Sequence, residues 1–145
     1  MAIGLDLAQV VARLQAQVAA LKKVGTAVDL ASAQEDLKNK LPACYLVPFA
    51  EVALGNALEN AVSQQVNEDF SVVYAISNLR DVRGEAASAD LRPIRGSVQT
   101  ALLGWTYDAN AYDPFIFVRG RLLALTNPVL WWIDTYRTVR YARAT

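Results

Sequence analysis

The sequence predicts an α+β fold, in which two main helices pack on one face of a sheet of roughly four, mostly antiparallel strands. Two amphipathic helical patterns and several apolar runs rich in β-branched and aromatic residues carry this prediction. At 145 residues the chain is expected to form one domain, 1–145, with a core of its own. Hydrophobic residues make up 54% of the chain and charged residues 19%, which excludes a disordered chain.

The clearest helix is predicted over residues 6–24. Apolar residues recur there at spacings of three and four, from Leu7 to Leu21, and so share one face. Asp6 is a good N-cap residue, and Gly25 is expected just beyond the helix end. Because only one face is apolar, we expect this helix to lie on a sheet. A second, short helix is predicted over 29–40.

The first strands are expected on either side of an ambiguous segment. Residues 43–47 form a short apolar run of the kind that buried strands show, and Pro48 is expected to end it. Residues 49–62 fit either a helix or a loop. Residues 61–78 fit either a hairpin or one long strand, of which we favour the long strand.

The segment 77–89 is polar and is predicted to be an exposed connection. We expect the next helix to begin at Asp90, which would place Pro93 in the first turn, and to end at Gly104. A polar loop is expected over 106–114. Strands are predicted over 115–118 and 129–141. Residues 122–125 either continue the first of these strands or restart it, and Gly120 is expected to mark a bulge or a close approach.

The last predicted strand alternates between its two faces. Leu130, Trp132 and Tyr136 fall on one face, and Trp131 and Ile133 on the other. One tryptophan on each face predicts that both faces of the sheet are at least partly covered.

Several classes of functional site are excluded or unsupported by composition. The chain has no histidine, which removes Ser-His-Asp and Cys-His catalysis and every histidine-containing metal site. Its single cysteine, Cys44, lies in an apolar run and is expected to be a buried thiol. The formal net charge is zero, which argues against a general nucleic-acid coat and favours association. No apolar run is long enough to span a membrane, and we expect no signal peptide.

Several short motifs follow one another along almost the whole chain: Leu46–Pro48, the strand Gln65–Val73, Asp81–Gly84, Leu102–Trp105, and the hairpin of Gly120–Leu123 with Leu130–Trp132. Each motif alone is weak. Their order and spacing resemble those of the tail-terminator (tail-completion) proteins of long-tailed bacteriophages. Residues 26–42 and 49–60 match nothing in that pattern.

The resemblance implies a small domain with helices against a β-sheet and a structural role in the virion, without catalysis, cofactor or metal. It implies a homo-oligomeric ring, as a hexamer, that caps the tail tube and stops its elongation. It also implies contact with head-side connector or neck proteins, passage of the genome DNA through the ring, and no membrane. The protein would then lie in the tail–neck region, after assembly in the host cytoplasm.

A ring subunit needs unlike surfaces that meet head to tail. The candidates on the last strand are Trp131, Trp132 and Tyr136, because large aromatic residues are enriched at interface centres. The alternative for both tryptophans is the subunit's own core. Tyr107 and Tyr112 in the loop 106–113 are a second candidate contact, against a plain solvated loop.

The basic end of the chain is a third candidate. Arg137 and Arg140, followed by Arg143, would dock on an acidic rim of the tube or neck or line a DNA path. The alternative is a solubilising terminus.

Two other functions stay open. One is a head–tail connector or another tube-associated subunit. The other belongs to a different class: a small hydrolase or ligand-binding domain that uses carboxylates alone. Such a domain needs a pocket with paired acids of perturbed pKa, and no spacing in the sequence commits to one.

Overall fold

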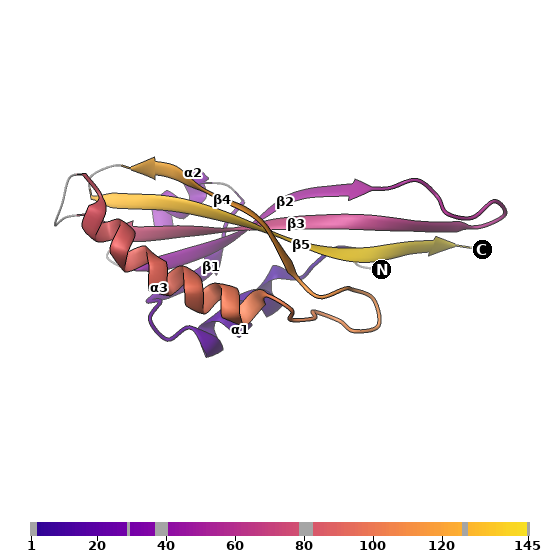
Figure 1. The fold of residues 1–145 in the computed structure, drawn as a ribbon, viewed down its shortest axis with the longest axis horizontal. Coiled ribbons are helices and arrows are strands. Elements are labelled where there is room, and N and C mark those ends of the chain that lie inside the picture. Colours follow the sequence, from indigo (N-terminus) through magenta and orange to yellow (C-terminus); the bar gives the residue numbers. More distant parts are fainter. Residues whose placement is uncertain (1–2, 29, 37–40, 79–82, 126–127, 145) are drawn as a thin grey trace.

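The computed structural model describes residues 3–28, 30–36, 41–78, 83–125 and 128–144. This part of the chain holds three helices, α1 (Leu7–Gln17), α2 (Leu30–Asp36) and α3 (Glu85–Leu102), with a five-stranded sheet. The strands are β1 (Lys23–Thr26), β2 (Ala43–Ala53), β3 (Val62–Ser77), β4 (Ile116–Leu125) and β5 (Val129–Ala144). The fold is therefore α+β, as the sequence predicts (Figure 1).

The sheet is mixed, with the strand order β1-β2-β3-β5-β4. Strands β2 to β5 pair antiparallel, whereas β1 runs parallel to β2. The prediction of roughly four strands is corrected here to five, because residues 23–26 form a strand and not the end of the first helix. Val24 pairs with Cys44 there and is buried, so the backbone groups and the side chain both find partners in the sheet.

The first helix begins where the sequence predicts and ends earlier. The Asp6 carboxylate accepts a hydrogen bond from the Ala8 amide at 3.0 Å, which caps α1. The helix stops at Gln17, and Val18 closes it with a backbone bond to Leu14. Of the second predicted helix, 30–36 is helical, and 37–40 lies outside the described residues.

The expectation that Pro48 ends the second strand is wrong. β2 continues to Ala53, with a register shift between Pro48 and Ala50 where it pairs with β3. β1 pairs with β2 only as far as Leu46, so Pro48 lies on an outer edge where its missing N–H breaks no ladder. The long-strand interpretation of 61–78 is confirmed by β3, which runs unbroken from Val62 to Ser77.

The third helix begins at Glu85 and not at Asp90. Gly84 precedes it with φ +82°, a left-handed conformation that glycine adopts without strain. The first turn looks polar in sequence, but Ala87 is buried against the core. Pro93 consequently lies inside the helix and not in its first turn.

Both faces of the sheet are covered over part of their area, as the two tryptophans predict. Helices α1 and α3 cover one face, where Val10, Leu14 and Val98 pack with Phe70 and Tyr74 of β3. We call this the helix face. On the opposite face, α2 contributes Ala33 to a smaller core that includes Tyr45, Val73 and Trp131.

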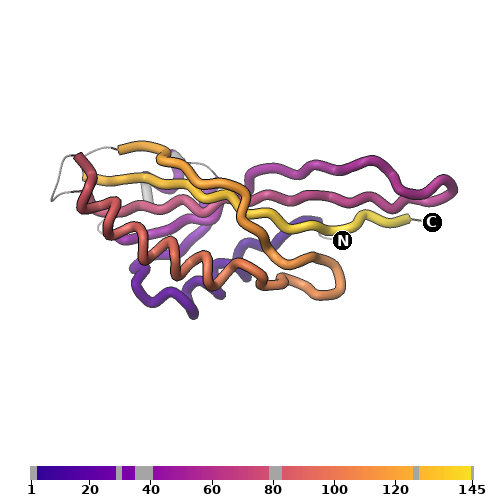
Figure 2. The backbone as a smooth tube through the Cα atoms, viewed as in Figure 1, coloured from indigo at the N-terminus to yellow at the C-terminus, as the bar shows by residue number. Residues whose placement is uncertain are grey.

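The sheet extends well beyond its helices. Strands β2, β3 and β5 continue together past α1 and α3 as a long three-stranded arm, and the β2–β3 connection forms its tip (Figures 1 and 2). The arm comprises residues 49–69 and 137–144. The pairing of β3 with β5 runs without a register shift from Phe70 opposite Tyr136 to Val62 opposite Ala144. The segment that leads into α1 lies beside the arm, and β5 ends within it (Figure 1).

Candidate assembly interface

Two of the predicted contact residues on β5 lie inside the subunit. Trp131 is 2% exposed and packs in the smaller core under α2. Tyr136 is fully buried on the helix face, where its ring stacks on Phe70 with centroids 5.7 Å apart. Burial raises the pKa of the Tyr136 hydroxyl above its ordinary range. The structure thus agrees with the core alternative for Trp131.

Trp132 belongs to a buried ion-pair cluster. Its Nε1–H donates to Asp134 at 2.8 Å, and the Arg95 guanidinium of α3 donates twice to the same carboxylate at 2.9 and 2.8 Å. The guanidinium also stacks 4.7 Å from the centre of the Trp132 ring. Because Asp134 has no exposed surface, these three donors keep a buried charge fully bonded.

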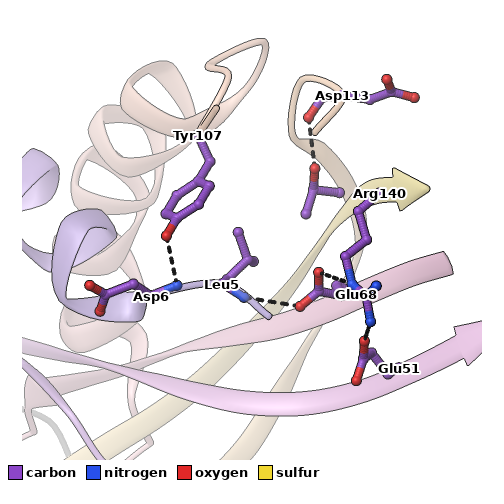
Figure 3. A network of polar contacts seen from close by, with 8 residues as sticks. Leu5, Asp6, Glu51, Glu68, Tyr107, Asp113 and Arg140 are labelled. Carbon is purple, nitrogen blue, oxygen red and sulfur yellow. Dashed lines mark hydrogen bonds and ion pairs between the residues drawn. The ribbon is translucent and has the colours of Figure 1, made fainter. Parts of the chain in front are cut away.

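The two loop tyrosines hold the α3–β4 loop against the rest of the chain. Their rings meet edge to face at 5.1 Å, and the Tyr107 hydroxyl accepts the Asp6 amide at 3.1 Å (Figure 3). The backbone of Tyr112 forms an isolated antiparallel β-bridge with Arg140 of β5. Burial, together with the nearby charge of Glu68, raises the pKa of the Tyr112 hydroxyl to about 12. The loop is therefore a docked segment.

The two arginines predicted to contact a partner form ion pairs within the subunit. Arg137 forms a bidentate pair with Asp69 across β3 and β5, at 2.7 and 3.0 Å. Arg140 bonds Glu51 of β2 and lies 3.0 Å from a Glu68 oxygen, while the other oxygen of Glu68 accepts the Leu5 amide (Figure 3). These pairs cross all three strands of the arm and tie its base to the N-terminal segment.

One group of exposed apolar side chains lies on the face of the sheet opposite α1 and α3, beyond the cover of α2. Phe117, Leu122 and Leu125 of β4 are exposed on the helix face instead. Cross-strand pairing places Ile116 and Arg119 of β4 on the face opposite α1 and α3, with the partners Arg137 and Thr135. We call this surface the open face; its exposed residues are Phe49, Val52, Ile116, Arg119, Arg121 and Tyr141. Phe49 and Val52 are each more than half exposed.

The open face carries cations without an acidic partner. Arg119 lies 5.9 Å from the centre of the Phe49 ring, and with Arg121 these side chains line a pocket of about 160 Å³. Neither Arg119 nor Arg121 forms an ion pair with any described residue. Two guanidinium groups beside exposed apolar rings are suited to a partner that brings both carboxylates and apolar groups.

A second hollow lies on the other side of the sheet, between the start of α1 and the end of β1. It has a volume of about 530 Å³, and its lining includes Ile3, Leu5, Val28 and Phe70. Ile3 and Val28 are 71% and 75% exposed. Asp6 stands at this hollow, and Tyr107, which contacts the Asp6 amide, is followed by the exposed Asp108. We call this surface the N-terminal hollow.

Sequence reasoning missed the open face because part of it had no assigned strand. Phe49 and Val52 fell in the segment 49–62, which fits either a helix or a loop, and their spacing of three does not follow strand alternation. The register shift between Pro48 and Ala50 brings both side chains to this face. In β4, Arg119 and Arg121 are two residues apart within an otherwise apolar strand, and so share one face. That pair of arginines was the available signal of a solvent-facing edge.

The family model described as "Phage tail terminator protein" matches residues 1–144. The chain belongs to the phage tail terminator family. No curated protein matches the chain. Membership makes this terminator a structural protein of the phage tail and a component of the virion tail, associated with other tail or neck proteins.

Other chemistry has little support in the terminator. Among the described residues, no group of three His, Cys, Asp or Glu side chains is placed to hold a metal ion. The Cys44 thiol is buried, and burial raises its pKa from 9.0 to about 12, so it stays protonated. Within the described ranges, no helix is both long and apolar enough to cross a membrane.

Proposed function

We propose that this terminator forms a ring, as a hexamer, that caps the last ring of the tail tube and stops its elongation. The same ring presents a surface to the head-side connector or neck proteins, and the genome DNA passes through it without sequence-specific contact. It lies in the tail–neck region after assembly in the host cytoplasm. The observation that carries this proposal is the family match over residues 1–144.

The surfaces of the subunit support a role in assembly. The arm and the open face leave large apolar side chains in water, Phe49, Val52, Ile116 and Tyr141 among them. Contiguous exposed apolar side chains mark interaction sites in soluble proteins. With no net charge, little self-repulsion opposes association of such subunits.

The carboxylate-dependent enzyme finds less support. Asp134 is bound by Arg95, Glu68 by Arg140, and Asp69 by Arg137. A catalytic pair of acids needs two carboxylates that push each other's pKa apart. Within the described part of the chain, the three buried or half-buried carboxylates are each paired with a cation instead, which is the arrangement of a structural ion pair.

Tube elongation tests the proposal directly. Purified tube protein of the same phage is allowed to polymerise with and without this protein, and tube lengths are measured by electron microscopy. We expect added terminator to stop further growth and to be seen at one end of each tube. Tubes that grow equally long in its presence, with both ends bare, would overturn the proposed function.

A further inference from the structure

The open face combines features that phosphate binding alone does not require. A surface that tracks a nucleic-acid backbone is dominated by Lys and Arg. Here Arg119 and Arg121 stand among the exposed apolar side chains of Phe49 and Ile116. Burial of those apolar groups needs a partner with an apolar surface of its own, which favours a protein over DNA.

The opposite charges lie on another part of the same chain. Asp6 lines the N-terminal hollow, and Asp108 follows Tyr107, whose hydroxyl accepts the Asp6 amide. Both carboxylates are exposed and form no ion pair with any described residue. The hollow exposes Ile3 and Val28. The N-terminal hollow is therefore apolar with an acidic border, whereas the open face is apolar with a basic one.

This charge separation decides between two kinds of self-association. A contact with two-fold symmetry would bring Arg119 and Arg121 of one copy against the same residues of the other, and like charges across an interface are costly. A head-to-tail contact instead brings the basic surface onto the acidic one. Unlike surfaces that meet in this way generate rings when the rotation closes.

We propose that the open face of one subunit packs against the N-terminal hollow of a second copy, with Arg119 and Arg121 facing Asp6 and Asp108. Phe49 and Ile116 would then bury against the exposed side chains of the hollow. The inference rests on the proposed ring-forming function and identifies the partner of the open face as this same chain.

Site-directed cross-linking tests the contact. Arg121→Cys and Asp108→Cys variants are prepared separately, mixed in the presence of tail tubes, and treated with a thiol-specific bismaleimide. The native thiol does not interfere, because Cys44 is buried. We expect a cross-linked dimer in the mixture and essentially none with either variant alone. Dimers from Arg121→Cys alone would show a symmetric contact and overturn the proposal, as would tube-bound protein that yields no cross-link in the mixture.

Charge reversal gives a second, independent readout. The double variant Arg119→Glu/Arg121→Glu should fall at least tenfold in its yield of assembled rings on tubes, and Asp6→Arg/Asp108→Arg should fall likewise. Mixing the two double variants should restore a hexamer in which they alternate, because each contact then joins unlike charges. Combining all four changes in one chain should also restore assembly. Arg92→Glu, an exposed change of the same charge on α3, is the control and should assemble normally.

The outcomes separate this inference from the proposed function. If the wild-type protein caps tubes and the Arg119→Glu/Arg121→Glu variant does so equally well, the function stands and the contact is wrong. If that variant assembles normally but loses binding to DNA fragments, the open face is a DNA surface and the proposal fails. If the wild-type protein neither assembles nor caps, the proposed function itself fails.

Discussion

At the scale of single residues, Gly120 shows how close contacts constrain the sequence. A Cβ at this position would collide with the Asp134 carboxylate and would lie 2.9 Å from Arg95 Nη2 and 3.1 Å from Trp132 Nε1. The glycine therefore lets β4 lie against the buried ion-pair cluster. The close approach predicted for this residue is the correct alternative to a bulge at the residue itself.

We predict that Gly120→Ala lowers the free energy of unfolding by about 1–3 kcal/mol, because the added methyl group must displace the ion-pair cluster. Gly96→Ala is the matched control. Gly96 lies in α3 with nothing within 4 Å of the added carbon, so this change should raise stability by about 0.5–1 kcal/mol. Urea denaturation of both variants checks the prediction; equal effects of the two changes would contradict it.

Cys44 predicts how stability depends on alkaline pH. Its pKa rises from 9.0 to about 12 on folding because burial penalises the thiolate. A raised folded pKa means that the full stability is present below about pH 9 and is lost as the pH rises, because only the unfolded chain releases the proton. The slope is at most about 1.4 kcal/mol per pH unit for one group.

We expect the urea midpoint to fall from pH 9 upward, and to fall less steeply in Cys44→Ala. Tyrosines with raised pKa, such as Tyr136, add to the loss near pH 10 in both proteins. The difference between the two pH profiles therefore isolates the thiol. Parallel profiles would show that Cys44 titrates alike in the folded and unfolded chains.

At the scale of elements, much of the fold follows from periodicity. The alternation of the last strand placed Trp131 and Trp132 on opposite faces, and the structure has them so. The long β3 strand and the start of α1 at its Asp6 cap also follow from local pattern. These features depend on residues that are close together in the chain, so local sequence pattern is enough to predict them.

The errors arise where tertiary contacts override local pattern. Residues 23–26 read as a helix end with a glycine stop, but pairing with β2 makes them a strand. The first turn of α3 reads as a loop because a single buried residue, Ala87, produces no apolar periodicity in the sequence. The open face was missed for the same reason. Whether Phe49 is exposed depends on which face of the sheet the helices leave uncovered, and local sequence does not show this.

Trp131 is predicted to stabilise the subunit and not the ring contact. Trp131→Ala should lower the free energy of unfolding by about 3–5 kcal/mol, because it leaves a cavity beside Tyr45 and Val73. At a temperature where the variant remains folded, it should still cap tubes. A variant with wild-type stability that fails to assemble would contradict this and would show that Trp131 takes part in a subunit contact.

The arm is predicted to open more readily than the rest of the sheet. Its tip strands have free edges and no helix over them, whereas Leu46 and Tyr74 lie in the core. Amides of Val62 and Gln64 should exchange with deuterium orders of magnitude faster than those of Leu46 and Tyr74 in the free protein. Uniform protection of the whole length of β3 would contradict this.

At the scale of the whole molecule, the net charge is zero, but unpaired positive and negative side chains of the described residues lie on different surfaces. The open face holds Arg119 and Arg121, whereas Asp6 lines the N-terminal hollow and Asp108 follows Tyr107, which contacts Asp6. In the proposed contact these opposite charges attract each other. The attraction between exposed charges is screened by salt, with a Debye length of about 3 Å at 1 M.

Assembly of the ring should accordingly weaken when salt is raised to about 1 M, without a loss of subunit stability, since the buried pairs are screened far less. Sedimentation of tube-bound protein at increasing salt, alongside thermal melting of the free subunit, separates the two effects. Assembly that strengthens with salt would indicate a contact dominated by apolar burial.

The most direct test of the ring-forming account is the mass of the protein in solution, measured by light scattering alone and again with tail tubes. The account predicts a ring-sized species, either free or formed at one tube end with loss of further elongation. A protein that remains a monomer and ignores the tubes would contradict it.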